Sequence, residues 1–172
     1  MRTATSENSS LKSQPEDRNH YEGPAPACAA ALAFLQAYWR GSLEDALASA
    51  TMDAVIELPR SIPLPSPAPL AQVLPLIFGR IYSCFANGRF DIHIERCLVD
   101  GEAVIVEYTA TGDLVSGRVF RCRYLVILEM QAGRVARFRP YTDTKYVDDE
   151  LFVRLPNAHP GRPEKGGGKS PC

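Results

Sequence analysis

Three stretches in the second half of the chain alternate between apolar and polar residues, and this pattern constrains the fold more than any other feature. They span Ala103–Thr111, Arg118–Met130 and Arg134–Asp143, with glycine-containing turns between them. Successive side chains of a strand point to opposite faces of its sheet, so the pattern predicts three antiparallel strands that share one apolar face. A sheet with one apolar face must bury it. The residues on that face are Val104, Val106, Tyr108, Ala110, Phe120, Cys122, Tyr124, Val126, Leu128, Ala136, Phe138, Pro140 and Thr142.

The first half of the chain supplies the expected cover. Apolar residues at helical spacing predict helices over Ala27–Trp39, from Ser42 to about Ala50, and over Pro69–Phe85. Asp53–Leu58 is typical of a short strand. Five prolines in residues 59–69 then predict an extended loop without regular strand pairing.

One more strand and a short helix complete the pattern. Phe90–Val99 is predicted to be a strand, and Asp100-Gly101 a hairpin turn into the stretch above. Lys145–Phe152 is predicted to be helical. The helices come first and the strands last, which favours an α+β fold with helices packed on one face of a curved antiparallel sheet. Alternation within Phe90–Val99 puts Phe90, Ile92, Ile94 and Leu98 on one face and Asp91, His93, Glu95 and Cys97 on the other.

Composition excludes several kinds of partner. The formal net charge of −1 gives no electrostatic reason to expect nucleic acid or an anionic membrane surface. No apolar run approaches the roughly 18–20 residues that span a bilayer. The five cysteines show no metal-ligand or redox-motif spacing, which predicts a reduced, cytoplasmic protein without a metal site. Cys84, Cys97 and Cys122 are interpreted as small apolar core side chains.

The two ends of the chain differ from the middle. Residues 1–22 are polar and predict a disordered tail, and residues 154–172 combine prolines with Gly166–Gly168, which predicts a flexible tail. Residues 23–153 are therefore expected to form one domain.

Three motifs resemble those of a known family. Asp53–Pro59 is similar to its first-strand motif and Val106–Gly112 to a central strand. Gly133–Val135 followed by Arg139–Thr144 resembles its terminal Arg-x-Tyr-x-Asp strand. Together they resemble the SnoaL-like polyketide cyclases, which share a cone-shaped α+β superfamily with ketosteroid isomerase, limonene epoxide hydrolase and nuclear transport factor two. The resemblance covers roughly Pro24–Phe152 and implies three N-terminal helices over the concave face of the sheet; the superfamily hosts many unrelated activities.

The resemblance also shows which family positions hold other residue types here. The proton-shuttling aspartate of ketosteroid isomerases corresponds to Leu58, with Glu57 beside it. The Arg and two Asp of limonene epoxide hydrolases correspond to Tyr108, Ala110 and Pro140. Epoxide hydrolysis by that triad is therefore not expected, nor is isomerisation by a base at the usual place.

The SnoaL-type cyclases use a pocket Asp and His as acid/base groups. Asp143 is the candidate for the first, and His93 for the second, but alternation places both on the charged face. Asp143 as a catalytic acid competes with a structural role, in which it hydrogen-bonds backbone near the final helix.

Glu57 and Tyr108 complete the set of candidate catalytic residues with Asp143. Glu57 lies between Ile56 and Leu58, ahead of the proline loop. In an apolar cavity its pKa would rise, which suits a general base; the alternative is a solvated or ion-paired glutamate on the outer face. The Tyr108 phenol can polarise a carbonyl or phenolate oxygen; the alternative is a core tyrosine bonded to backbone or water.

Further residues on the apolar face of the sheet, on the helices and at the end of the first strand are candidates for ligand contact, with plain core packing as the alternative. They are Tyr38, Leu58, Phe78, Tyr82, Cys122, Tyr124, Phe138 and Thr142. On the opposite face, Arg121, Arg123, Arg137 and Arg139 alternate with glutamates. They can form an anion site, but a solvated or homodimer-forming sheet face is the favoured interpretation.

Three functions are compatible with these features. The first is a cofactor-independent acid/base isomerase or cyclase that acts on a small apolar carbonyl, polyketide-like or terpenoid metabolite. The second is a non-catalytic module that binds a small apolar molecule. The third is a dimeric scaffold domain whose interior is filled, which an interior pocket smaller than ~300 Å³ would favour.

Overall fold

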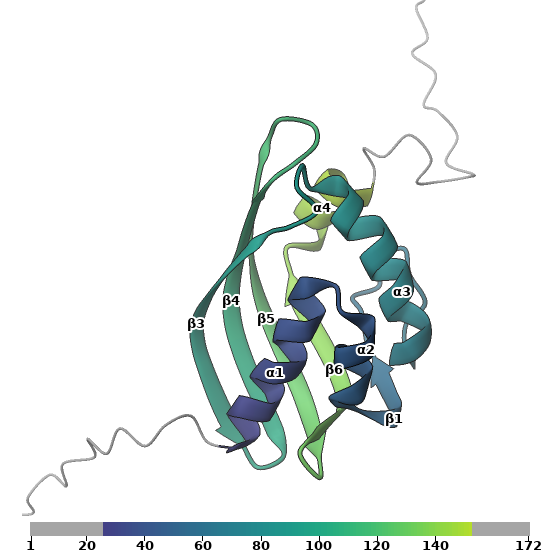
Figure 1. Cartoon of the computed structure of the whole chain (residues 1–172), viewed down its shortest axis with the longest axis vertical. Helices are drawn as coiled ribbons and strands as arrows, with labels where there is room; N and C mark the ends of the chain where they lie inside the picture. Colours follow the sequence, from purple (N-terminus) through teal and green to yellow (C-terminus); the bar gives the residue numbers. More distant parts are fainter. Residues whose placement is uncertain (1–25, 153–172) are drawn as a thin grey trace, which may run out of the picture.

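Residues 26–152 are described by the computed structural model of the chain, so the predicted tails 1–22 and 154–172 lie outside the described residues. A six-stranded sheet in the order β2-β1-β6-β5-β4-β3 curves around the helices, as Figure 1 shows. The helical layer contains α1 (Pro26–Arg40), α2 (Leu43–Ala48) and α3 (Leu70–Ile81). The predicted α+β architecture is confirmed.

Four antiparallel strands form most of the sheet: β3 (Asp91–Asp100), β4 (Ala103–Asp113), β5 (Val119–Gln131) and β6 (Arg134–Thr142). They match the four long strands expected from alternation.

The other edge of the sheet was only partly predicted. β1 (Ala50–Ile56) begins three residues before the predicted strand and pairs in parallel with β6. β2 (Ala68–Pro69) pairs with the end of β1. The expectation that the proline loop forms no ladder pairing is therefore wrong at its last two residues.

The apolar face lies on the concave side, as predicted. Tyr108 of β4 is directly opposite Tyr124 of β5, and Ala110 is opposite Cys122. Tyr108, Ala110 and Cys122 are buried, and Tyr124 is half-buried. The arginines on the other face of β5, Arg121 and Arg123, are exposed. The alternation of apolar and polar residues in β4 and β5 therefore correctly predicted which of these side chains face the core.

A β-bulge changes the alternation in β3. Ile94 pairs with Tyr108, but Cys97 pairs with Val106, so the strand contains one extra residue near Glu95. The extra residue turns Cys97 to the concave side and Leu98 to the outer face, where Leu98 is 50% exposed. The predicted faces of Cys97 and Leu98 are therefore wrong.

The bulge has a covalent consequence. Cys97 forms a disulfide bond with Cys28 in α1, with a Cα–Cα distance of 6.5 Å. The prediction that Cys97 is a free, reduced core side chain is therefore wrong. Cys84 and Cys122 are free and buried, as predicted.

Aromatic side chains fix the helices on the sheet. Phe34 and Tyr38 of α1 both pack edge-on against Phe138 of β6, with ring centroids 5.4 and 5.3 Å apart. Such edge-to-face pairs add about 0.5–1.5 kcal/mol each beyond the area they bury. α3 buries Leu70, Val73, Leu74 and Ile77, while its internal proline, Pro75, is exposed.

Short helical segments lie at the ends of α3 and β6. The predicted third helix ends at Ile81 and continues as the 3-10 turn η1 (Tyr82–Cys84). The predicted helix after β6 is confirmed as α4 (Thr144–Val147) and the π-helical turn η2 (Asp148–Phe152). No helix within residues 26–152 is long and apolar enough to cross a membrane.

Candidate functional site

An inner pocket of about 50 Å³ lies between the helices and the concave face of the sheet. The sheet contributes Tyr108, Tyr124, Pro140 and Thr142, and the helices contribute Tyr38, Ile77, Ile81, Val147 and Phe152. The proline loop closes the remaining side with Leu58, Pro59, Ile62 and Leu64.

A second void of about 30 Å³ lies next to the inner pocket. Tyr38, Ile81, Tyr108 and Tyr124 line both spaces and therefore lie between them. Small-molecule sites usually have volumes of about 300–1,000 Å³. Both voids are much smaller, so a ligand of ordinary size requires these side chains or the proline loop to move.

The pocket wall carries phenol groups that stay neutral. Tyr108 and Tyr124 stack with ring centroids 5.1 Å apart and an interplanar angle of 9°. Burial raises the pKa of Tyr108, Tyr124 and Tyr38 above the usual value for tyrosine. These hydroxyls therefore remain protonated at neutral pH and can donate hydrogen bonds to an oxygen in the pocket.

The single tryptophan of the chain lies beside this wall. The Trp39 ring packs edge-on against Tyr108 with centroids 4.9 Å apart. The Trp39 side chain also interacts with the Tyr108 hydroxyl, which lowers the pKa of Tyr108 against the larger, opposite effect of burial. Trp39 fluorescence is therefore a natural reporter for changes at Tyr108.

Cys122 lies next to the pocket, and its thiol has low reactivity. Its thiol is 2.9 Å from the Thr142 hydroxyl, which itself donates to the Arg123 carbonyl at 3.0 Å. Burial raises the pKa of the Cys122 thiol. A thiol with a raised pKa holds little thiolate at neutral pH, so Cys122 is a packing and hydrogen-bonding group rather than a nucleophile.

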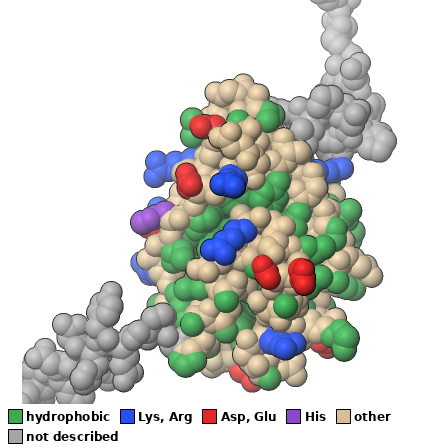
Figure 2. All heavy atoms as spheres, viewed as in Figure 1, with side chains coloured by type: hydrophobic (Ala, Val, Ile, Leu, Met, Phe, Trp, Pro, Cys, Tyr) green, Lys and Arg blue, Asp and Glu red, His purple; other side chains and the backbone are tan. Residues whose placement is uncertain are grey.

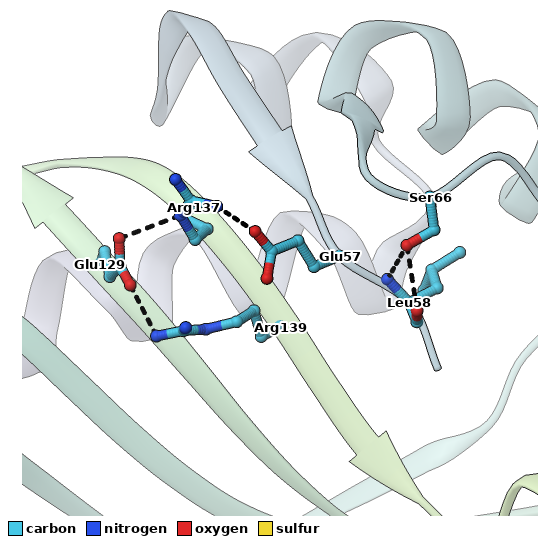
Figure 3. Close-up of polar contacts among 6 residues, drawn as sticks. All are labelled: Glu57, Leu58, Ser66, Glu129, Arg137 and Arg139. Carbon is cyan, nitrogen blue, oxygen red and sulfur yellow. Dashed lines mark hydrogen bonds and ion pairs between the residues drawn. The ribbon is translucent and has the colours of Figure 1, made fainter. Parts of the chain in front are cut away.

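Glu57 lies on the outer face of the sheet, as Figure 3 shows. Its carboxylate forms an ion pair with Arg137. Arg137 also contacts Glu129 at 3.1 Å, and Glu129 contacts Arg139 at 2.6 Å, which extends the network along β5 and β6. This is the outer-face alternative considered for Glu57, and it points the carboxylate away from the pocket.

Asp143 is exposed and caps α4. Its carboxylate accepts a hydrogen bond from the Tyr146 backbone N–H at 3.0 Å. This is the structural alternative considered for Asp143. Of the three candidate catalytic residues, only Tyr108 lines the pocket, and His93 is exposed on the outer face as predicted.

Half of the candidate ligand-contact residues line the inner pocket: Tyr38, Leu58, Tyr124 and Thr142. Phe138 is fully buried in the core behind Tyr38. Phe78 packs between Tyr38 and Tyr82, and the Tyr82 hydroxyl donates to the Tyr38 carbonyl at 2.6 Å.

The loop side of the pocket was not predicted from the sequence. Ile62 and Leu64 alternate with prolines in residues 59–69, and apolar residues in a proline-rich loop could have suggested an inward-facing wall. Ser66 holds this wall in place, because its hydroxyl contacts both the N–H and the carbonyl of Leu58, at 2.7 and 3.0 Å (Figure 3).

The pocket has the chemistry of a neutral site. Within residues 26–152, the side chains that line it include no carboxylate, imidazole, lysine or arginine. The described residues also hold no cluster of three or more His, Cys, Asp or Glu side chains that could bind a metal ion. The arrangement can enclose an uncharged group and hydrogen-bond one of its oxygens.

Comparison with protein families assigns the fold to a known group. The model of the SnoaL-like domain matches residues 31–138, more than half of the chain. The chain belongs to the SnoaL-like family. The family resemblance expected from the sequence is thereby confirmed. No curated protein sequence is similar enough to this SnoaL-like protein to count as a match.

Solved structures share the fold at low sequence identity. TerC, crystallised with polyporic acid, is 15% identical over 74% of this chain and 98% of its own, with a TM-score of 0.63. A putative SnoaL-like polyketide cyclase from Jannaschia is 16% identical over 82% and 100% of the two chains, with a TM-score of 0.59. An epoxide hydrolase of the limonene epoxide hydrolase type from Mycobacterium tuberculosis is 23% identical over 73% and 89%, with a TM-score of 0.53. At these identities the likeness concerns the fold alone.

Proposed function

We propose that this SnoaL-like protein binds a small, uncharged, mostly apolar molecule that carries a carbonyl or phenolic oxygen. The observation that supports this proposal is the wall of the inner pocket, where neutral hydroxyls stand among apolar side chains. Tyr38, Tyr108, Tyr124 and Thr142 supply the hydroxyls. A carboxylate buried there would lose its hydration without gaining a charged partner, so the pocket should reject anions.

The ligand needs more room than the inner pocket offers. Residues 57–67, which include most of the proline loop, lie outside the helices and strands, so this wall lacks the regular backbone hydrogen bonding of the other walls. Figure 2 shows hydrophobic side chains gathered on the face of the molecule that carries the helices. Outward movement of Ile62 and Leu64, together with rotation of the tyrosines between the two voids, would join the spaces. A rigid wall would instead favour the filled scaffold alternative.

The proposed binding can be tested with a matched pair of ligands. 2-Naphthol is planar, uncharged and phenolic, whereas 2-naphthoate has a similar ring system and a carboxylate. Calorimetric titration should detect binding of 2-naphthol and at least tenfold weaker binding of 2-naphthoate. Equal affinities, or binding of the anion alone, would contradict the proposal, and no binding of either compound would favour the scaffold.

Hydroxyl deletions locate the binding. Tyr108→Phe and Tyr124→Phe each remove one oxygen from the pocket, so each should weaken 2-naphthol binding by about fivefold, the equivalent of roughly 1 kcal/mol per hydrogen bond. Tyr141→Phe on the outer face is the matched control and should bind like the wild type. If Tyr141→Phe had the same effect as Tyr108→Phe, the ligand would be bound elsewhere.

A second candidate function is cofactor-independent isomerisation or cyclisation of such a molecule. Neutral phenols favour it, because Tyr108 and Tyr124 can stabilise charge that develops on a carbonyl oxygen. Glu57 and Asp143 can contribute as bases only if they leave their present partners. Mass spectrometry of ligands after incubation tests this function: a product that forms with the wild type and not with Tyr108→Phe would support catalysis, and unchanged ligands would leave binding as the function.

The outer face of the sheet is the proposed homodimer interface. Leu98, Leu125 and Tyr141 are 50%, 40% and 46% exposed on it. Ion pairs surround them, with Glu107 between Arg96 at 3.3 Å and Arg123 at 3.8 Å. Exposed apolar side chains within a ring of neutralised charges are typical of a protein interface.

A further inference from the structure

The disulfide bond joins two elements that are far apart in the sequence. Cys28 lies in the first turn of α1, and Cys97 follows the bulge of β3, 69 residues later. Without the bulge, alternation would point Cys97 away from α1. The extra residue in β3 is therefore what brings the two sulfur atoms together.

The first half of α1 packs on the core mainly through small side chains, with Ala31 fully buried and Ala27, Ala30 and Leu32 partly buried. Apart from Cys28 and Leu32, residues 27–33 are all alanine, whose side chains bury little surface. The large buried side chains Phe34 and Leu35, and the half-buried Tyr38, lie in the second half of the helix. The disulfide is thus the strongest link between the beginning of α1 and the sheet.

The strand at the other end of the bond is also lightly held. Within residues 26–152, β3 is an edge strand that pairs with β4 alone. Ile94 and Val99, on its concave side, are 38% and 42% exposed. Elements with few buried contacts open at low free-energy cost, so a covalent bond changes their behaviour more than that of the core.

The end of α1 connects this link to the pocket. Tyr38 lines both voids, and Trp39 packs against Tyr108. In this structure the bond is intact, α1 is held at both ends, and the inner pocket measures about 50 Å³. Release of the first half of the helix would leave its second half free to tilt, with Tyr38 as the side chain that moves in the pocket.

We propose that Cys28–Cys97 is a thiol-exchange site that controls access to the pocket. Cys97 is half-buried on the edge strand and Cys28 is buried, so an incoming thiolate attacks the Cys97 sulfur. A mixed disulfide with Cys97 forms and the Cys28 thiolate leaves. When the reductant is a dithiol, its second thiolate breaks the mixed disulfide and releases Cys97. The dithiol is oxidised to a disulfide, and both cysteines end as thiols after taking up two protons.

Hydrogen exchange and alkylation test the site without any ligand. In untreated protein, mass spectrometry should find Cys28 and Cys97 linked and unavailable to iodoacetamide. After dithiothreitol treatment, backbone amides of residues 29–37 should exchange at least tenfold faster. The double variant Cys28→Ser/Cys97→Ser should show the fast exchange with or without dithiothreitol, and Cys172→Ser should behave like the wild type.

Two results would overturn the proposal: alkylation of Cys28 and Cys97 in untreated protein, or an intact bond whose reduction leaves exchange in α1 unchanged.

The access step rests on the proposed function, and stopped-flow Trp39 fluorescence with 2-naphthol tests it. The association rate should rise at least tenfold on reduction in the wild type and be constant in the double variant. If 2-naphthol bound neither form while exchange in α1 increased, the thiol-exchange site would stand and the proposed ligand function would fail. If 2-naphthol bound the oxidised and the reduced wild type at the same association rate, the disulfide would not control access to the pocket.

Discussion

Gly112 of β4 shows how closely individual residues are packed around the aromatic core. A Cβ atom at this position would lie 2.8 Å from the Phe85 ring and 3.1 Å from the Phe90 Cβ. Phe85 cannot easily retreat, because its own ring packs edge-on against Phe120 with centroids 5.6 Å apart. The absence of a side chain at Gly112 is therefore a packing requirement of this corner of the sheet.

Gly112→Ala should lower the free energy of unfolding by about 1–3 kcal/mol, the usual cost of overpacking a core. Gly79→Ala is the matched control, because a Cβ there meets nothing within 4 Å and the residue lies inside α3. The control should be more stable by about 0.5–1 kcal/mol, since alanine favours a helix over glycine. Urea unfolding measures the change in the free energy of unfolding for both variants. A stabilised Gly112→Ala would contradict the described packing.

The buried phenols make stability sensitive to alkaline pH. Burial raises the pKa of Tyr38, Tyr82, Tyr108 and Tyr124. The folded chain therefore keeps these protons at a pH where the unfolded chain loses them. Their contribution to stability is complete below pH 10, the ordinary tyrosine value, and falls as the pH rises above it.

Each buried tyrosine should remove up to about 1.4 kcal/mol of unfolding free energy per pH unit above pH 10. Denaturant unfolding between pH 8 and 11 measures this slope, and absorbance at 295 nm reports phenolate. In Tyr108→Phe, the free energy of unfolding should fall less steeply with pH, because one fewer proton is released on unfolding. Phenolate absorbance equal to all seven tyrosines in a chain that is still folded would show that the four phenols are not buried.

At this scale, sequence alternation predicted some residues and could not predict others. Tyr108 and Cys122 lie in long strands, where many alternating neighbours determine one face. Glu57 follows a strand of seven residues and lies two residues before Pro59, so alternation around it is too short to determine its direction. Its ion pair with Arg137 of β6 depends on the parallel pairing of β1 and β6, which no local pattern reveals.

At the scale of elements, the proline loop is the part of the pocket wall that local bonds can control. Ser66 bonds both backbone groups of Leu58 and thereby clips the loop to the end of β1. The bonds lie at an exposed position, where water competes for the same groups. Their loss should therefore loosen the loop without unfolding the domain.

Ser66→Ala should destabilise the protein by about 1 kcal/mol, the typical net value of a hydrogen bond, and speed amide exchange in residues 58–69. Ser61→Ala is the control, because Ser61 is an exposed serine in the same loop. If loop movement admits ligands, Ser66→Ala should also bind 2-naphthol faster. Unchanged exchange in residues 58–69 would show that Ser66 does not hold the loop.

Sequence periodicity predicted most of the elements but not the irregularity within β3. Apart from the two-residue strand β2, the strands and helices were predicted to within a few residues, because each has a clear period of two or close to 3.6. The bulge in β3 was not predicted, because the residue types around it give no sign of an extra residue in the strand. The extra residue nevertheless reverses the face to which every later side chain of β3 points. The disulfide was missed for the same reason, since it depends on the reversed face of Cys97.

At the scale of the whole molecule, the outer face of the sheet is the proposed contact between two copies. Leu125→Asp places a charge at the centre of this face, beside Glu107 and Tyr141 in the strand register. Val115→Asp is the control, because Val115 is 64% exposed in the turn between β4 and β5, away from the face.

Light scattering coupled to size-exclusion chromatography should give a dimer mass for the wild type and for Val115→Asp. Leu125→Asp should give a monomer, or a dimer dissociation constant at least tenfold higher, because burying an unpaired carboxylate is costly. A monomeric wild type, or equal masses for both variants, would contradict the proposed interface.

The order of elements along the chain has a consequence for folding during synthesis. β1 lies beside β6, so the sheet is complete only after the last long strand has left the ribosome. Until then Phe34 of α1 lacks Phe138, the β6 side chain that it packs against in the complete sheet. Contacts between such distant segments slow folding and prolong the exposure of apolar surface. The nascent chain should therefore depend on chaperones for longer than a protein of this size whose neighbouring segments pair in the order in which they are made.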